Sequence, residues 1–124
     1  MSTLPIPTAQ PGPGSTVDEL TVLIDDVRRF RDERPCHQAR TSADGLALLR
    51  QLQTQRIDHL WLDHDLIGAD TVMPILEHLI ANRHDIGTIH VHTANISAGQ
   101  VMMRHLAAAG YAVVRSYNLR MWTW

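Results

Sequence analysis

The stretch Leu60-Trp61-Leu62-Asp63-His64-Asp65-Leu66 places two carboxylates and an imidazole at the end of a strongly apolar run. Two other apolar runs, residues 20–24 and 87–91, also end in polar residues, Asp25-Asp26 and His92-Thr93. In an open α/β sheet the carboxyl ends of the strands meet at one edge and form the ligand site there. The sequence therefore predicts a polar site at the carboxyl edge of a parallel sheet.

Strand-like and helix-like segments alternate along the rest of the chain, which predicts a parallel sheet with right-handed crossovers. Strands are expected at residues 19–24, 36–40, 57–62, 87–91 and 111–115. Three helices are expected: one capped by Thr41 or Ser42, one running from a cap at Asp70 to about Arg83, and one running from a Ser97–Gln100 capping box to Gly110. Residues 27–35 are rich in charge and are predicted to be a loop.

Composition limits the class of protein. The chain has 124 residues, of which 44% are hydrophobic, and this fits a single domain at residues 17–124 behind a disordered Pro/Gly-rich tail at residues 1–16. The net charge of −2 implies no general affinity for nucleic acid or membranes. One cysteine, Cys36, excludes an intrachain disulfide framework, and there is no signal peptide or long apolar run. We therefore expect a cytoplasmic protein.

The acidic residues are candidates for a metal site. Asp25, Asp26 and Asp63 would repel one another at one edge of the sheet, and a divalent cation relieves such repulsion. An oxygen-rich site suits Mg²⁺, and Mn²⁺ would substitute for it. The alternative is that Asp25 and Asp26 cap a loop or pair with neighbouring arginines.

His64, Asp65 and His92 are candidate catalytic residues. An imidazole that faces the site can move a proton near neutral pH, so His64 or Asp65 would act as base and His92 as acid. The alternatives are that His64 is a structural hydrogen-bonding residue and that His92 is an ordinary strand residue.

Four residues are candidates for binding phosphate, together with the positive end of the helix that starts near Ser97. Thr93 and Asn95 can donate hydrogen bonds to nonbridging oxygens. Arg115 can clamp two oxygens with its planar fork, and Arg28 offers a second guanidinium.

These residues resemble those of receiver domains in two-component signalling. The acidic pair, Asp63, Thr93 and Arg115 follow successive strands, as the receiver's acidic pair, phosphoacceptor aspartate, Thr or Ser, and Lys do. The resemblance covers residues 18–118 and implies a three-layer, flavodoxin-like α/β fold, with a five-stranded parallel sheet in the order 2-1-3-4-5. The chain departs from it because Arg115-Ser116 replaces the lysine and its proline, the first helix is shortened or lost, and the last helix is truncated.

A narrower resemblance is to the cyclic-phosphate-processing receiver-like domains. Their LDD-x-R, LDHDLG and HS-x-N segments are matched by Ile24-Asp-Asp-Val-Arg28, Trp61-Leu-Asp-His-Asp-Leu66 and Val91-His-Thr-Ala-Asn95, followed by Gly99. Ile67 intervenes before Gly68, and Thr93 stands for the serine. This resemblance implies metal-dependent processing of a cyclic phosphate.

The sequence leaves three functions open. The first is hydrolysis of a cyclic phosphate on a nucleotide, ADP-ribose or an RNA end, with Mg²⁺ or Mn²⁺. The second is a signalling receiver phosphorylated on Asp63. The third is a non-catalytic nucleotide-binding module, which the aromatic tail at residues 121–124 favours. That tail is also a candidate surface for a homodimer, and it is too short for a full helix.

Overall fold

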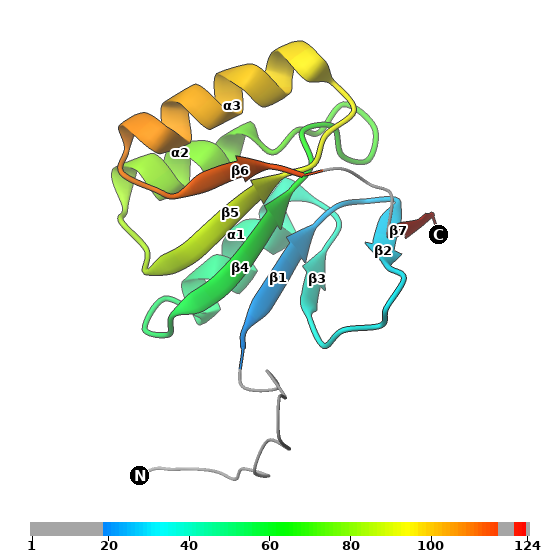
Figure 1. Cartoon of the computed structure of the whole chain (residues 1–124), viewed down its shortest axis with the longest axis horizontal. Coiled ribbons are helices and arrows are strands. Elements are labelled where there is room, and N and C mark those ends of the chain that lie inside the picture. Colours follow the sequence, from blue (N-terminus) through cyan, green and yellow to red (C-terminus); the bar gives the residue numbers. More distant parts are fainter. Residues whose placement is uncertain (1–18, 117–120, 124) are drawn as a thin grey trace, which may run out of the picture.

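A computed structural model describes residues 19–116 and 121–123, and the predicted tail at residues 1–16 lies outside these ranges. Five strands form a parallel sheet in the order β3-β1-β4-β5-β6 (Figure 1). Their bounds are β1 (Thr21–Ile24), β3 (His37–Ala39), β4 (Ile57–Leu62), β5 (Ile86–Val91) and β6 (Val113–Arg115). Counted along the chain within this sheet, the order is 2-1-3-4-5, which confirms the predicted topology.

Three helices connect these strands and form one layer against one face of the sheet: α1 (Ser42–Gln51), α2 (Met73–Ala81) and α3 (Ile96–Ala108) (Figure 1). The core between the helices and the sheet takes alternate strand residues, among them Ile24, Leu62 and Val91, because alternate side chains share a face. Within the described residues no helix covers the opposite face. The described residues therefore form two layers and not the three that the resemblance implies, because the first helix is lost and no helix follows β6 in the described part.

The residues predicted to cap the helices are correct for one helix and wrong for two. Thr41 caps α1, as predicted, and its hydroxyl accepts a hydrogen bond from the Asp44 amide. Asp70 does not cap α2, which begins after Val72 without a side-chain cap and with a proline in its first turn. Proline has no backbone N–H, so the first turn of α2 has one donor fewer that a capping side chain would need to satisfy. The Asp70 carboxylate instead accepts the amide and the hydroxyl of Ser42, each at 2.6 Å.

Helix α3 starts two residues earlier than the capping box predicts. Asn95 is its N-cap, and the side-chain oxygen of Asn95 accepts the Ala98 amide at 3.1 Å. The helix ends as predicted at Gly110, whose φ of 96° is a left-handed conformation that glycine adopts readily. The amides of Gly110 and Tyr111 bond back to the carbonyls of Ala107 and Leu106, which closes the helix with a Schellman motif.

Part of the predicted loop at residues 27–35 is a strand. β2 (Arg28–Phe30) pairs antiparallel with β7 (Met121–Thr123), so the tail contributes a strand to its own chain. The loop prediction was wrong because this pairing joins segments about ninety residues apart and needs no local apolar pattern. Phe30 is buried and meets Trp61 edge to face, with 5.2 Å between the ring centroids.

No helix in the described ranges has the length and apolar character needed to cross a membrane.

Candidate active site

Asp25 is the most constrained of the acidic residues. It follows β1, its amide donates to the Ala39 carbonyl, and its side chain is fully buried. Its Oδ1 accepts the amides of Val27 at 2.8 Å and Arg28 at 2.9 Å. Burial raises the pKa of Asp25, but hydrogen bonds from His92 and these two amides outweigh burial, so the pKa is lowered. Asp25 is therefore an anion held inside the protein.

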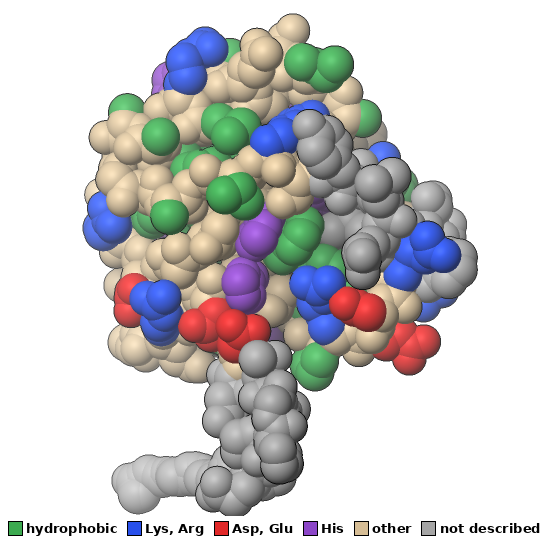
Figure 2. All heavy atoms as spheres, in the orientation of Figure 1, with side chains coloured by type: hydrophobic (Ala, Val, Ile, Leu, Met, Phe, Trp, Pro, Cys, Tyr) green, Lys and Arg blue, Asp and Glu red, His purple; other side chains and the backbone are tan. Residues whose placement is uncertain are grey.

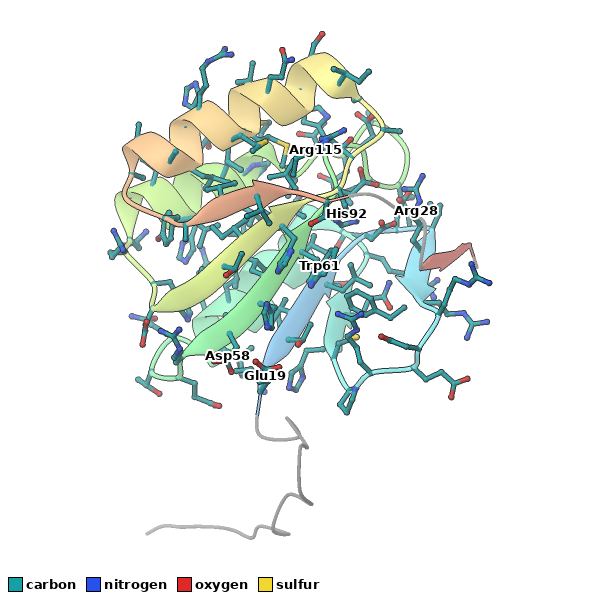
Figure 3. All side chains as sticks on the ribbon, in the orientation of Figure 1. Glu19, Arg28, Asp58, Trp61, His92 and Arg115 are labelled. Carbon is teal, nitrogen blue, oxygen red and sulfur yellow. The ribbon has the colours of Figure 1, made fainter. Side chains whose placement is uncertain are left out.

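His92 supplies the second restraint on Asp25. It follows β5, and its Nε2 lies 2.8 Å from Oδ2 of Asp25 in a pair whose side chains are both fully buried. Figure 3 shows the ring at the carboxyl end of the sheet. The other ring nitrogen, Nδ1, is also buried and has no hydrogen-bond partner among the described residues. The His92 ring is thus enclosed by the protein, where it bonds the buried Asp25 carboxylate.

Asp63 follows β4 and lies next to Asp25. Its amide donates to the Ile24 carbonyl, and its Oδ1 accepts the His64 amide at 2.8 Å. Burial and the negative charge of Asp25 raise the pKa of Asp63, although His92, the Thr93 hydroxyl and the His64 amide act in the opposite direction. A positive charge placed beside these two carboxylates would relieve the repulsion.

Three carboxylates meet at this edge and fit a hard divalent cation. Asp25, Asp26 and Asp63 each offer one oxygen, and these oxygens lie within 4.8 Å of one another. An all-oxygen donor set suits Mg²⁺ or Mn²⁺. Asp26 is half-buried, whereas Asp25 and Asp63 are buried, so Asp26 is the most accessible of the three.

Arg28, predicted to bind phosphate, reaches the same carboxylates. Its Nη1 lies 3.5 Å from Oδ2 of Asp63 and 3.7 Å from Oδ2 of Asp25. Gln38 fixes the backbone here, because its amide nitrogen donates to the carbonyls of Asp25 and Arg28. The sequence did not single out Gln38, since a glutamine in a short strand carries no recognisable signal. Arg28 is thus a cationic neighbour of the proposed metal ligands.

Thr93 and Arg115 form the other side of the site. Thr93 is buried, and its hydroxyl accepts the Asn95 amide at 3.1 Å. Arg115 Nη2 donates to the Thr93 carbonyl at 2.5 Å, whereas Nη1 is buried without a partner among the described residues. Gly99 leaves room for this guanidinium, because a Cβ there would collide with Nη1. Figure 3 shows Arg115 close to His92 and under α3.

His64 and Asp65 lie on the loop after β4 and contact each other. Nδ1 of His64 is 2.8 Å from Oδ1 of Asp65, and the Asp65 side chain is largely exposed. Asp65 is thereby placed to orient the ring. Asn95 is exposed at the start of α3, where its side-chain oxygen serves as the helix cap.

The fold and the site together define a receiver-like α/β domain with an acidic carboxyl edge. Residues 20–108 match the family model of the cyclic-phosphate processing receiver domain, and the chain belongs to this family. The match confirms the resemblance seen in the sequence. No curated protein gave a match.

Proposed function

We propose that this protein is a metal-dependent phosphoesterase that hydrolyses a cyclic phosphate on a nucleotide, ADP-ribose or an RNA end. The observation that carries the proposal is the juxtaposition of three carboxylate oxygens, within 4.8 Å of one another, with Thr93, which follows β5, and Arg115, which ends β6. The family to which the chain belongs adds cyclic-phosphate processing as the reaction class.

Asp26 and Asp63 are the principal ligands that we assign to the cation. Asp25 completes the cluster, but its two oxygens already accept two backbone amides and the His92 ring, so it has less capacity left for a metal. A bound Mg²⁺ or Mn²⁺ supplies Lewis-acid polarisation of the phosphoryl oxygens and neutralises their charge.

Arg115 and Thr93 bind the phosphoryl group in this proposal. The buried Nη1 of Arg115 has no hydrogen-bond partner among the described residues, and the Thr93 hydroxyl lies beside Asp63. Asn95 supports these donors by capping the first turn of α3, whose free amides attract an anion. Charge that develops on the phosphoryl oxygens in the transition state is thus met by preorganised donors.

His64 is the proton-transfer residue that we propose, with Asp65 as its orienting partner. A water oxygen forms the new bond to phosphorus, one ring P–O bond breaks, and the products are a phosphomonoester and a free hydroxyl. His64 takes one proton from the water, the leaving oxygen receives one proton from solvent, and His64 then returns its proton to solvent. His92 is buried against Asp25, so we assign it the role of positioning that carboxylate.

Turnover of a panel of cyclic phosphates tests the proposal. Nucleoside 2′,3′-cyclic phosphates and ADP-ribose cyclic phosphate are incubated with the protein and Mg²⁺ or Mn²⁺, and the products are separated by chromatography. We expect ring opening by the wild type and its loss in Asp63→Asn. Asp85→Asn, a change of an exposed carboxylate away from the site, is the matched control and is expected to retain turnover.

The same preparation separates the two other functions. Acetyl phosphate followed by intact-mass measurement detects a phosphoaspartate at Asp63, which would identify a signalling receiver. Nucleotide binding without turnover would identify a binding module. If the folded, metal-loaded wild type opens no cyclic phosphate in the panel, the hydrolase proposal is wrong.

A further inference from the structure

The face of the sheet without helices carries two histidines in contact. His59 lies on β4 and His90 on β5, and the register that pairs Trp61 with His90 makes the two histidines diagonal neighbours. Nδ1 of His59 is 3.1 Å from Nε2 of His90. Figure 2 shows histidine side chains side by side on this face, between groups of arginine and acidic side chains. Two imidazole nitrogens thus meet on the face of the sheet that none of the described helices covers.

In each ring one nitrogen, here called the inner nitrogen, faces the other ring, and the second, outer nitrogen lies near an oxygen atom. Nε2 of His59 lies 3.4 Å from Oε2 of Glu19, and Nδ1 of His90 lies 3.1 Å from Oγ of Ser116. Both oxygens can accept a hydrogen bond, so each ring can carry its proton on the outer nitrogen and leave its inner nitrogen unprotonated. In that state both inner nitrogens have a lone pair available for one shared ion. Metal-binding histidines are typically oriented in this way, by a hydrogen bond from the outer nitrogen.

Packing keeps the rings in place. His90 stacks on Trp61 with 4.0 Å between the centroids and 4° between the planes, and Trp61 is itself packed against Phe30. Burial, followed by the charges of His59, Arg34 and His92, lowers the pKa of His90 to about 4, so its ring is neutral at neutral pH. A neutral imidazole is the form that binds metal. The side chain of His59 is 33% exposed, which leaves one side of the pair open to solvent.

We propose that His59 and His90 form a second metal site, which binds a borderline divalent cation such as Zn²⁺ through two imidazole nitrogens. Two nitrogens that bind one tetrahedral ion at about 2.0–2.1 Å are separated by about 3.3 Å, close to the 3.1 Å between these two. Water completes the coordination. Imidazole ligands favour Zn²⁺, Ni²⁺ or Cu²⁺, whereas the carboxylates of the acidic cluster favour Mg²⁺, so the two sites differ in metal preference.

A Zn²⁺ titration against a competing chromophoric chelator tests the second site. The titration uses the full chain with Asp63→Asn, which weakens the acidic cluster. This background is tested alone and combined with His59→Asn or His90→Asn. The matched control combines it with His105→Asn, which changes an exposed histidine on α3. We expect one Zn²⁺ to bind to Asp63→Asn and to its His105→Asn derivative. We expect affinity to fall at least tenfold in the His59→Asn and His90→Asn derivatives. Glu19→Gln should weaken binding by about tenfold, as loss of an orienting partner does.

Failure to bind Zn²⁺, or binding unaffected by His59→Asn and His90→Asn, would show that the 3.1 Å contact is an ordinary N–H···N hydrogen bond and would overturn the proposal. If the histidine variants do not fold, nitrogen NMR of the histidine rings in Asp63→Asn decides. Shifts at Nδ1 of His59 and Nε2 of His90 on addition of Zn²⁺ support the site, and unchanged signals overturn it. The result does not depend on turnover, so it is separate from the test of hydrolysis.

Discussion

Nε2 of His92 lies 2.8 Å from Oδ2 of Asp25, although the strands that the two residues follow are not neighbours in the sheet. β4 lies between β1 and β5, and Asp63 follows β4. The pair therefore links the ends of β1 and β5 across β4, the strand that Asp63 follows. This link fixes the position of Asp25 relative to Asp63, on which any shared cation depends.

Replacing His92 should destabilise the protein, because the change leaves the buried Asp25 carboxylate without one of its donors. We expect His92→Asn to lower the free energy of unfolding by about 2–4 kcal/mol. Urea denaturation measures the change. The control is His105→Asn, at an exposed position, where we expect less than about 0.5 kcal/mol. A similar small effect in both variants would show that the pair contributes little.

Removing Arg28 should strengthen Mg²⁺ binding. Its guanidinium lies 3.5 Å from Asp63 and 3.7 Å from Asp25, where it competes with a cation for the same oxygens. We expect Arg28→Gln to raise Mg²⁺ affinity by about threefold to tenfold, which corresponds to roughly 1 kcal/mol. Isothermal titration calorimetry measures the affinity, and Arg104→Gln is the control on the exposed surface of α3. Weaker Mg²⁺ binding in Arg28→Gln would mean that Arg28 positions the carboxylates for the metal.

Gly99→Ala should reduce phosphate-ester turnover without unfolding the protein. The added Cβ would displace the Arg115 guanidinium and lie 3.1 Å from Cγ2 of Thr93, whereas alanine is a better helix former than glycine by about 1 kcal/mol. We expect stability equal to or above that of the wild type, and a loss of kcat/KM comparable to that of Arg115→Lys. Thermal unfolding and steady-state kinetics measure the two effects. Full activity in Gly99→Ala would remove Arg115 from the proposed phosphate site.

Gly45→Ala should have the opposite effect on stability. A Cβ at Gly45 would lie 2.5 Å from Cδ1 of Ile75 and 2.7 Å from Cδ1 of Ile24, where α1 contacts both α2 and the sheet. Overpacking of this kind costs about 1–3 kcal/mol, which exceeds the gain in helix propensity. Guanidinium chloride denaturation measures the loss, with Ala47→Gly, an exposed change in the same helix, as a comparison for propensity alone. An increase in stability would show that α1 can move away from the sheet.

The bond between Asp70 and Ser42 should make stability depend on pH. Hydrogen bonds from the Ser42 side chain and amide lower the pKa of Asp70 below its value of about 3.9 in the unfolded chain. The unfolded state therefore binds the proton first as pH falls. The stabilisation is present in full above the unfolded pKa and is lost as pH falls through the folded pKa. We expect Asp70→Asn to lose less than about 1 kcal/mol near neutral pH and to unfold with a weaker acid dependence. Urea denaturation at several pH values measures the difference. An equal loss of unfolding free energy with falling pH in Asp70→Asn and the wild type would contradict this prediction.

The sequence predicted the parts of the fold that depend on local patterns. Apolar runs identified β1, β4 and β5, and the polar residues after them identified the acidic cluster, because a parallel sheet brings carboxyl ends together. The start of α3 was missed because two neighbouring polar residues, Asn95 and Ser97, can each cap a helix, and backbone geometry decides between them. The contact of His59 with His90 was missed because it depends on the register between two strands.

β2 and β7 were also missed, because their pairing joins segments far apart in the sequence. This pairing has a consequence for biosynthesis. The strand that carries Arg28 pairs with residues that the ribosome adds about ninety residues later. The parallel sheet can assemble as soon as β6 has emerged, whereas β2 must wait until the residues after β6 supply its partner. A nascent chain released before Met121 would have all of its carboxylates but no paired strand to hold the guanidinium beside them.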